Sequence, residues 1–336
     1  MKKTIRSMSV AVLAALLAIP VLTGVANGGE AGAPGAGDTL EFVSCFGPGG
    51  GHDTMLRHME KAIRTGNILS NPIIYTYKPG GNMAVGMQYT KSQAGRGDIL
   101  MAATNQLIGV PLQMDIGVKR EELTDMAVWG AQYLVFWVLK EKAEKEGWKT
   151  FDDMLKSGKP VTFTSPGGGS FEEILTLYLE TQIPNSDFRS IAVDGDAEAM
   201  TQLLGGHLDC FINEFAGGGL EAYIASGDVI GLACAGSKRS VYGPEIPTLR
   251  ELGYDFALDS FRGLMGPPNM SPEALAWWQD ILAKIKETDS FKEYMVLNGI
   301  EPNFMIGKEL TEYFDNYKKS LITAFTLADI EMVPNP

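Results

Sequence analysis

The sequence predicts an α/β fold in two domains, each built on a parallel sheet with helices on its faces. Strand-like apolar runs alternate with helix-like segments along most of the chain, and this alternation is typical of parallel sheets. The chain of 336 residues is long enough for two domains of ordinary size. Two longer apolar stretches, at 128–139 and 261–268, break the alternation, and we interpret both as crossovers. They divide the chain into a first domain, 38–137 plus 261–336, and an inserted second domain, 138–260.

The N-terminal segment, 1–26, has the pattern of a secretory signal peptide. Three basic residues precede an apolar run at 10–22, and small residues follow up to Ala26. The apolar run is shorter than the roughly 20 residues that a membrane-spanning helix needs, although a membrane anchor is the alternative. We expect a flexible leader at 27–37, rich in Gly and Ala, and a periplasmic or otherwise extracytoplasmic protein.

The strands and helices are expected in regular alternation. Strands are expected at 40–46, 73–77, 99–103, 161–164, 190–193, 208–213 and 229–233. Helices are expected at 54–64, 83–92, 171–181, 197–204 and 216–225. A later helix begins after Ser271 as its cap, with Pro272 at the first helical position. A final helix at 308–327 would complete the first domain.

Charge and cysteine content narrow the classes of function. The formal net charge is −13, and loss of the three basic residues of the signal peptide makes it about −16. Such a chain is a poor candidate for binding nucleic acid. It can still bind an anion, because local backbone dipoles can outweigh the global field. Cys45, Cys210 and Cys234 lie in apolar runs, which favours buried free thiols, with a Cys210–Cys234 bridge as the open alternative.

Three glycine-containing turns, at 47–53, 165–170 and 194–196, each join a strand to a helix. Glycine lets a ligand reach the backbone, and the helix that follows offers unpaired N–H groups with a partial positive charge. Such turns bind carboxylate or phosphate groups. Ser170 and Glu173 also fit a capping box, so this turn could be a plain helix start without a ligand. Turns from two domains that face each other would share one cleft.

Other kinds of site are not supported by the sequence. No Gly-Lys-Ser/Thr follows the first glycine turn, as a phosphate-binding P-loop would need, and the G-x-G-x-x-G spacing of a dinucleotide site is absent there. The histidines His52, His58 and His207 are not spaced for a zinc site, and no G-x-S-x-G nucleophile motif is present. We therefore expect no metal, no cofactor and no catalytic residues.

Six short motifs of this chain are similar to those of one protein family. They are FGPGGGHD at 46–53, KPGGN at 78–82, TSPG at 164–167, GDA at 195–197, LGGHLD at 204–209, and SKRS followed by PTL at 237–249. The last motif is the most specific. The chain resembles the extracytoplasmic solute-binding proteins of tripartite tricarboxylate transporters, also called the Bordetella uptake gene family, and the resemblance extends over about residues 38–330.

The resemblance implies a bilobal type II periplasmic-binding-protein fold, in which a ligand cleft between two parallel-sheet domains closes about a hinge. It implies a monomeric protein, not an enzyme, that needs no cofactor. This protein would pass a small carboxylate to the membrane permease subunits of a tripartite tricarboxylate transporter. The carboxylate could be a di- or tricarboxylate, an aromatic acid or an amino acid. The expected ligand-binding residues are Phe46, Gly49, Gly50, Asp53, Gly81, Asn82, Thr104, Asn105, Ser165, Gly168, Gly169, Ser170, Phe171, Asp196 and Asn213.

Within this resemblance, several positions depart from the family pattern. Cys45 and Tyr77 replace the usual Pro and Asn, and Glu214 places an acid beside the ligand-facing Asn213. Asp196 and Glu214 would suit a polar or amino-bearing carboxylate. Two alternatives remain open. One is a sensor that signals to a receptor kinase, and the other is an exported hydrolase or lyase with a carboxylate base in the same cleft.

Overall fold

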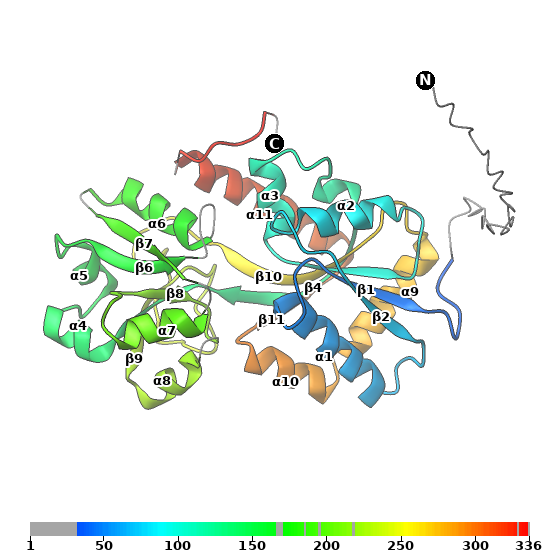
Figure 1. The fold of residues 1–336 in the computed structure, drawn as a ribbon, viewed down its shortest axis with the longest axis horizontal. Coiled ribbons are helices and arrows are strands. Elements are labelled where there is room, and N and C mark those ends of the chain that lie inside the picture. Colours follow the sequence, from blue (N-terminus) through cyan, green and yellow to red (C-terminus); the bar gives the residue numbers. More distant parts are fainter. Residues whose placement is uncertain are drawn as a thin grey trace, which may run out of the picture.

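The structure is a computed structural model that describes residues 32–165, 171–184, 186–193, 196–216, 219–327 and 329–334. The predicted signal peptide and the first residues of the predicted leader lie outside these ranges. Figure 1 shows two lobes side by side, joined by long strands. None of the helices that the structure describes combines the length and the apolar character that a bilayer crossing requires.

The first lobe is built on a six-stranded sheet with the strand order β11-β4-β10-β3-β1-β2. Its strands are β1 (Leu40–Ser44), β2 (Ile73–Tyr77), β3 (Ile99–Ala103), β4 (Thr124–Tyr133), β10 (Asp259–Gly266) and β11 (Glu301–Met305). Its helices are α1 (Gly51–Thr65), α2 (Ala84–Ser92), α3 (Gln106–Gln113), α9 (Pro272–Ile285), α10 (Asp289–Leu297) and α11 (Gly307–Leu327), with a 3-10 turn at Arg120–Glu122. The strands β1, β2 and β3 are parallel, as their alternation with helices predicts.

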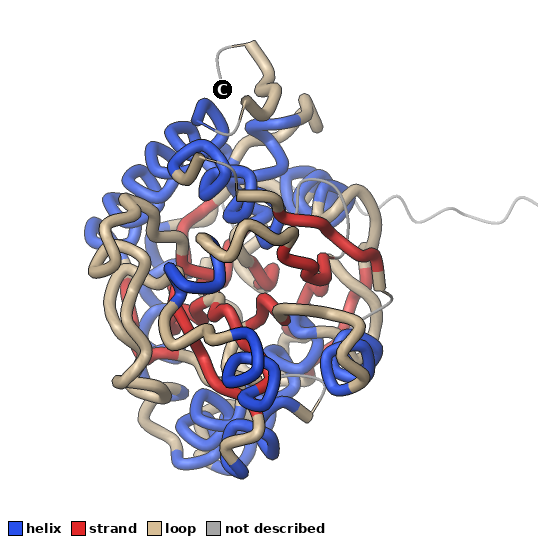
Figure 2. Tube along the Cα trace, turned by 90° about the vertical axis from the view of Figure 1, so that its left-hand side faces the viewer, coloured by secondary structure: helices blue, strands red, loops and turns tan. Residues whose placement is uncertain are grey.

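The second lobe contains a three-stranded sheet, β8-β5-β9, and a parallel pair, β6-β7. A single parallel bridge between Phe163 and Cys210 connects the two. Its strands are β5 (Val135–Leu139), β6 (Val161–Ser165), β7 (Phe188–Ala192), β8 (Phe211–Asn213) and β9 (Val229–Cys234). Its helices are α4 (Lys140–Glu146), α5 (Phe151–Leu155), α6 (Phe171–Gln182), α7 (Asp196–Leu204) and α8 (Leu220–Ser226). Figure 2 shows the strands inside the molecule and the helices around them.

The strands that cross between the lobes account for the antiparallel pairing. Each antiparallel strand pair described by the structure contains β4, β5 or β10. The stretches at 128–139 and 261–268, predicted as crossovers, correspond to β4–β5 and to β10. Because β4 carries the chain out of the first lobe and β10 brings it back, the two run in opposite directions. The predicted domain ranges remain a prediction, although β5 pairs entirely within the second lobe.

Two helix starts differ from the sequence prediction by more than one residue. The helix α1 begins at Gly51, before the expected residue 54, so His52 and Asp53 belong to its first turn. The helix α8 begins at Leu220, after the expected residue 216. Gly219, which precedes it, has a φ of 84°, and the glycine run in front of Leu220 disfavours helix formation.

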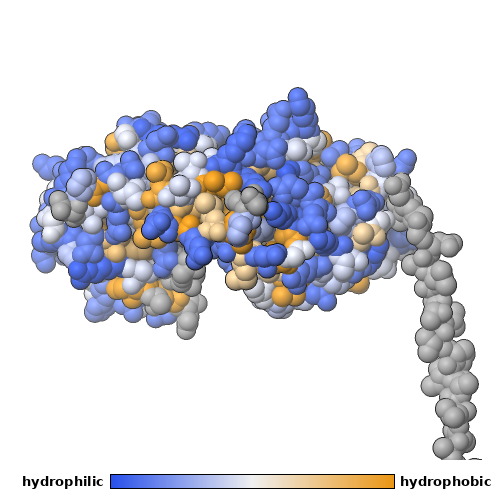
Figure 3. All heavy atoms as spheres, turned by 90° about the horizontal axis from the view of Figure 1, so that it is seen from above, coloured by the Kyte–Doolittle hydropathy of each residue, from blue (hydrophilic) through white to orange (hydrophobic). Residues whose placement is uncertain are grey.

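The apolar core is continuous between the lobes. One cluster includes Val43 and Leu107 of the first lobe together with Phe136 and Phe163 of the second. All three cysteines are buried and free, which confirms the free-thiol prediction. Trp278 is fully buried, and its Nε1 donates to the Gly97 carbonyl over 2.8 Å. From above, apolar side chains gather near the middle of the displayed face (Figure 3).

Candidate functional site

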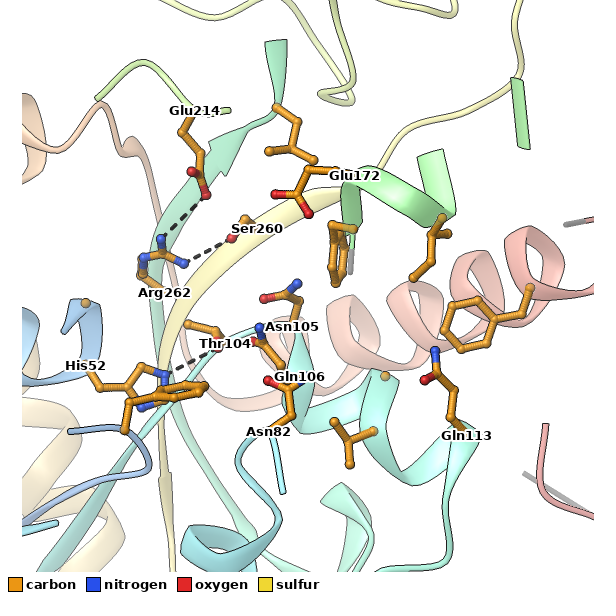
Figure 4. A pocket seen from close by; sticks show the side chains of 18 residues that line it. His52, Asn82, Thr104, Asn105, Gln106, Gln113, Glu172, Glu214, Ser260 and Arg262 are labelled. Atoms are coloured by element: carbon orange, nitrogen blue, oxygen red, sulfur yellow. Dashed lines mark hydrogen bonds and ion pairs between the residues drawn. The ribbon is translucent and has the colours of Figure 1, made fainter. Parts of the chain in front are cut away.

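A cavity of about 510 Å³ lies between the lobes. Its volume is in the range of sites for small molecules. Its walls come from both lobes, and the lining residues are Phe46, Gly51, His52, Asn82, Thr104, Asn105, Gln106, Gly109, Val110, Gln113, Leu134, Phe171, Glu172, Ile174, Glu214, Ser260, Arg262 and Phe325. Figure 4 shows that most of the labelled side chains are amides, hydroxyls and charged groups.

The start of α1 forms one wall of this cavity. Gly51 and His52, the first two residues of the helix, line the cavity, and the first N–H groups of a helix have no partner within it. The loop before them is held by its own hydrogen bonds. The Gly49 N–H donates to Asp53 Oδ2 over 2.8 Å, and the Gly50 N–H donates to the Gly47 carbonyl over 3.3 Å.

Asp53 organises this loop. Its carboxylate accepts from the Tyr77 hydroxyl over 2.7 Å and from Arg57 Nε over 2.9 Å, in addition to the Gly49 N–H. Burial alone would raise its pKa, but the hydrogen bonds from Arg57, Gly49 and Tyr77 hold the pKa of Asp53 below its ordinary value. The side chain is therefore ionised and fully engaged in the loop.

A chain of hydrogen bonds runs from the backbone of Cys45 to the cavity. The Cys45 N–H donates to His52 Nδ1 over 3.4 Å, so the proton of this imidazole is on Nε2. His52 Nε2 then donates to Thr104 Oγ1 over 3.3 Å (Figure 4). The Thr104 hydroxyl in turn donates to Gln106 Oε1. Because Oε1 accepts this bond, the amide nitrogen of Gln106 is left as a donor at the cavity wall.

Burial lowers the pKa of His52 to about 3, and the positive charge of Arg262 acts in the same direction. The ring is 3% exposed. His52 is therefore neutral at physiological pH and keeps the tautomer that the hydrogen bonds require. Phe46 contacts it edge-on, with 4.7 Å between the ring centroids.

The strand β10 places a positively charged side chain, that of Arg262, at the cavity. Alternation along the strand directs Ser260 and Arg262 to the same face, and both line the cavity. Arg262 Nη1 donates to Ser260 Oγ over 3.0 Å, and Arg262 Nη2 lies 3.7 Å from Glu214 Oε1 (Figure 4). The side chains of Arg262 and Glu214 are 17% and 20% exposed. Trp137 Nε1 donates to the Glu214 carbonyl over 3.1 Å, which fixes the backbone at this residue.

The turn before α2 presents Asn82 to the cavity. Gly80, Gly81, Asn82 and Met83 all have positive φ angles, between 48° and 129°. Glycine adopts this conformation freely, whereas Met83 is strained in it. Such local strain is common at functional sites.

The residues predicted from the sequence are distributed unevenly around this cavity. Those that line it are Phe46, Asn82, Thr104, Asn105 and Phe171. Those that are described but not among the lining residues are Gly49, Gly50, Asp53, Gly81, Asp196 and Asn213. Ser165 ends β6, and Gly168, Gly169 and Ser170 lie outside the described residues. Contact of any of these residues with a ligand stays a prediction.

Asp196 and Asn213 contact each other in the second lobe. Asp196 begins α7, and a hydrogen bond joins its carboxylate to Asn213. Asn213 Nδ2 also donates to the Ala216 carbonyl over 3.3 Å. Asn213 is 6% exposed, so its amide mainly holds the backbone near Glu214 in place.

Sequence reasoning missed several polar residues of the wall. Arg262, Ser260, Gln106, Gln113 and Glu172 were not singled out. Arg262 carried a usable signal, because a charged residue inside an apolar crossover strand needs a partner or a ligand. For His52 the sequence offers only its poor spacing for a zinc site. Among the described residues, no group of three or more His, Cys, Asp or Glu side chains is placed to hold a metal ion.

The comparisons with known proteins agree on one family. The model of the tripartite tricarboxylate transporter family receptor matches residues 55–325. Protein BugT of Bordetella pertussis is 24% identical over 282 residues, which cover 80% of this chain and 84% of BugT.

Two solved structures show the same fold. A TctC solute binding protein from Polaromonas has a TM-score of 0.73 at 21% identity, covering 86% of this chain and 98% of that one. Rpa4515 of R. palustris, solved with adipate, has a TM-score of 0.71 at 16% identity, covering 87% of this chain and 98% of that one. These likenesses confirm the bilobal solute-binding-protein fold that the sequence predicts.

Proposed function

Because this chain belongs to the tripartite tricarboxylate transporter family of receptors, we propose that it is an extracytoplasmic solute-binding protein that captures a small carboxylate between its lobes. The observation that carries the proposal is the cavity of about 510 Å³, whose walls come from both lobes and contain Arg262, two glutamates, and several amides and hydroxyls. The chain would act as a receptor without catalysis. It would deliver the ligand to membrane permease subunits, as a monomer exported by its signal peptide.

The first lobe supplies donors for a carboxylate. The N–H groups of Gly51 and His52 lie at the positive end of α1 and border the cavity. The Gln106 amide and the Arg262 guanidinium add side-chain donors. A hydrogen bond to a charged group contributes about 1.5–3 kcal/mol, so three or four of them, less the cost of closure, are enough for micromolar binding.

The second lobe completes the site from the other side. Phe171 and Glu172, at the start of α6, and Glu214, after β8, line the cavity opposite the first-lobe residues. We expect the lobes to move about the crossover strands, where Leu134 separates β4 from β5. The predicted contacts of Gly168, Gly169 and Ser170 would add N–H donors before α6. The predicted contact through Gly49 and Gly50 would require their present hydrogen bonds to open.

The binding site is tested by filling it at Gly51. A Cβ added at Gly51 meets no atom within 4 Å, so a Gly51→Val side chain would project into the cavity without a clash inside the protein. Thermal-shift and calorimetric titration against mono-, di- and tricarboxylates, aromatic acids and amino acids should give a ligand for the wild type. The Gly51→Val variant should bind it at least tenfold more weakly.

Gly47→Val is the matched control, because Gly47 lies in the same loop, has open space around it and does not line the cavity. Equal loss of binding in both variants, or undiminished binding in Gly51→Val, would place the site elsewhere.

Delivery of the ligand to a permease is tested with the compound that these titrations identify. Cells that lack the gene should take up the labelled compound more slowly, and an unchanged rate would contradict a transport role.

A further inference from the structure

The side chains that line the cavity include more acidic than basic groups. Among the described lining residues, Arg262 is the one cationic side chain, whereas Glu172 and Glu214 are both acidic. His52 is neutral, because burial lowers its pKa to about 3. The wall therefore carries more negative than positive side-chain charge. The N–H groups at the start of α1 and the Arg262 guanidinium could each bind one carboxylate, but a ligand without a cation would place no positive charge beside Glu214, which lies 3.7 Å from Arg262.

Arg262 and Glu214 form a loose ion pair in which each side chain can still bind a group of the ligand. Their closest atoms, Nη2 and Oε1, are 3.7 Å apart, which is within ion-pair range but longer than a hydrogen bond. Arg262 Nη1 is oriented by Ser260 over 3.0 Å. Both side chains are largely buried, at 17% and 20% exposure. Among the described residues, neither charge has an oppositely charged group within hydrogen-bond distance, so each gains most from one that the ligand supplies.

The surroundings keep the two groups in place. Trp137 Nε1 donates to the carbonyls of both Asn213 and Glu214 over 3.1 Å, and these hydrogen bonds hold the backbone of Glu214 in place. Arg262 lies on β10, which is paired with β4 at Gly130. Glu214 belongs to the second lobe, whereas β10 is part of the first-lobe sheet. The pair therefore joins the two lobes across the cavity.

We propose that Arg262 and Glu214 together recognise a carboxylate that also carries a protonated amine. The ligand carboxylate binds the Arg262 guanidinium, and the ligand ammonium binds the Glu214 carboxylate. This inference rests on the proposed function and narrows its substrate class. In the bound state each buried charge of the pair has a direct partner of opposite charge, which the present 3.7 Å separation does not provide.

The test uses ligand pairs that differ only in the amine. Succinate is compared with aspartate, glutarate with glutamate, and adipate with 2-aminoadipate, by calorimetric titration of the wild-type protein at pH 7.5. At one chain length or more, the amino compound should bind at least tenfold more tightly than its partner. Equal binding, or tighter binding of the plain dicarboxylate at every length, would overturn the inference.

Variants then separate recognition from structure. Glu214→Gln should weaken the amino compound at least tenfold and leave the plain dicarboxylate unchanged or bound more tightly, because the acid that repels it is gone. Arg262→Met should weaken both members of a pair. Glu245→Gln, an exposed acid that does not line the cavity, is the control and should change neither. If Glu214→Gln weakens both members equally, Glu214 only supports Arg262 and the inference is wrong.

The outcomes also separate this inference from the proposed function. Binding of dicarboxylates without preference for an amine would leave a carboxylate receptor but remove the inference. Failure of all six compounds, together with the wider set of acids, would contradict both. The wild-type comparison decides the inference even if a variant does not fold.

Discussion

At the scale of single residues, His52 shows how burial fixes the direction of a hydrogen-bond chain. The ring accepts from the Cys45 N–H and donates to Thr104, which in turn donates to Gln106. A protonated ring would have to donate at both nitrogens, and the Cys45 N–H would lose its acceptor. The neutral form is therefore required for the Cys45 N–H to keep its acceptor, which holds the ring with Nε2 directed at Thr104.

The pKa of His52 predicts a pH-dependent contribution to stability. Its folded pKa of about 3 lies below the ordinary value of 6.5, so the unfolded state binds more protons between these values. This contribution is complete above pH 6.5 and is lost as the pH falls toward 3. Between pH 7.5 and pH 5 it should decrease by about 2 kcal/mol. The readout is the difference in free energy of unfolding between wild type and His52→Gln, from urea titrations at both pH values.

The comparison with His52→Gln removes the titration of all other groups, which both proteins share. The variant should be less stable than the wild type at pH 7.5, and the gap should narrow at pH 5. A gap that is the same at both pH values would show that the folded protein protonates this ring as readily as the unfolded chain does.

The sequence predicted the loop residues of the cavity better than the strand residues. Phe46, Asn82 and Thr104 follow strands or precede helices, and the carboxyl ends of parallel strands meet at one edge. Arg262 lies inside a crossover strand. Whether it faces the cavity or the core depends on the register of β10, and a shift by one residue would reverse it. The register is set by pairing with β3 and β4, which are distant in sequence.

At the scale of elements, the contact between α2 and the end of β1 depends on a glycine. A Cβ added at Gly86 would lie 2.3 Å from Cys45 Sγ and 2.9 Å from Cys45 Cβ. Glycine in a helix costs about 1 kcal/mol relative to alanine, so this close approach must compensate for it. The contact holds α2 against β1 and thereby positions Asn82, in the turn before the helix, at the cavity.

Gly86→Ala should therefore destabilise the protein by about 1–3 kcal/mol, despite the higher helix propensity of alanine, because the core around Cys45 cannot accept another carbon. The measurement is the free energy of unfolding from urea titration. Gly109→Ala in α3 is the matched control, since its nearest atom, Leu321 Cδ1, is 4.0 Å from the added Cβ. The control should be neutral or slightly stabilising. Equal effects in the two helices would show that Gly86 is not needed for the packing.

The alternation of elements was predictable, whereas strand direction was not. Apolar runs of strand length locate β1 and β3 because both faces of these strands are covered, whereas β2, at the edge of the sheet, is only partly buried. The antiparallel pairs of β4, β5 and β10 depend on which strand the chain meets after it has crossed between lobes. The local sequence does not determine which strands pair there. The helix starts at Gly51 and Leu220 were displaced for a local reason, since glycine runs before them allow several starting residues.

At the scale of the whole molecule, the two lobes share one apolar core. The largest cluster joins Val43 and Leu107 of the first lobe to Phe136 and Phe163 of the second. The helix α11 adds to this connection, because it packs against β4 and α3 and also contacts α6 of the second lobe. The Tyr317 hydroxyl on α11 donates to the Asp259 carbonyl at the start of β10 over 2.7 Å.

We therefore expect the lobes to unfold as one cooperative unit. Chains with separate domains often show separate transitions, but a shared core makes the loss of one lobe expose apolar surface of the other. Tryptophans report on each lobe, since Trp129 and Trp278 belong to the first and Trp137 and Trp148 to the second. Variants that keep only the tryptophans of one lobe should give coincident urea midpoints by fluorescence and by circular dichroism.

A bound ligand should raise the unfolding midpoints of both lobes equally, because it contacts both lobes. Separate midpoints, or a ligand effect confined to one lobe, would show that the lobes are independent and that the cavity does not couple them.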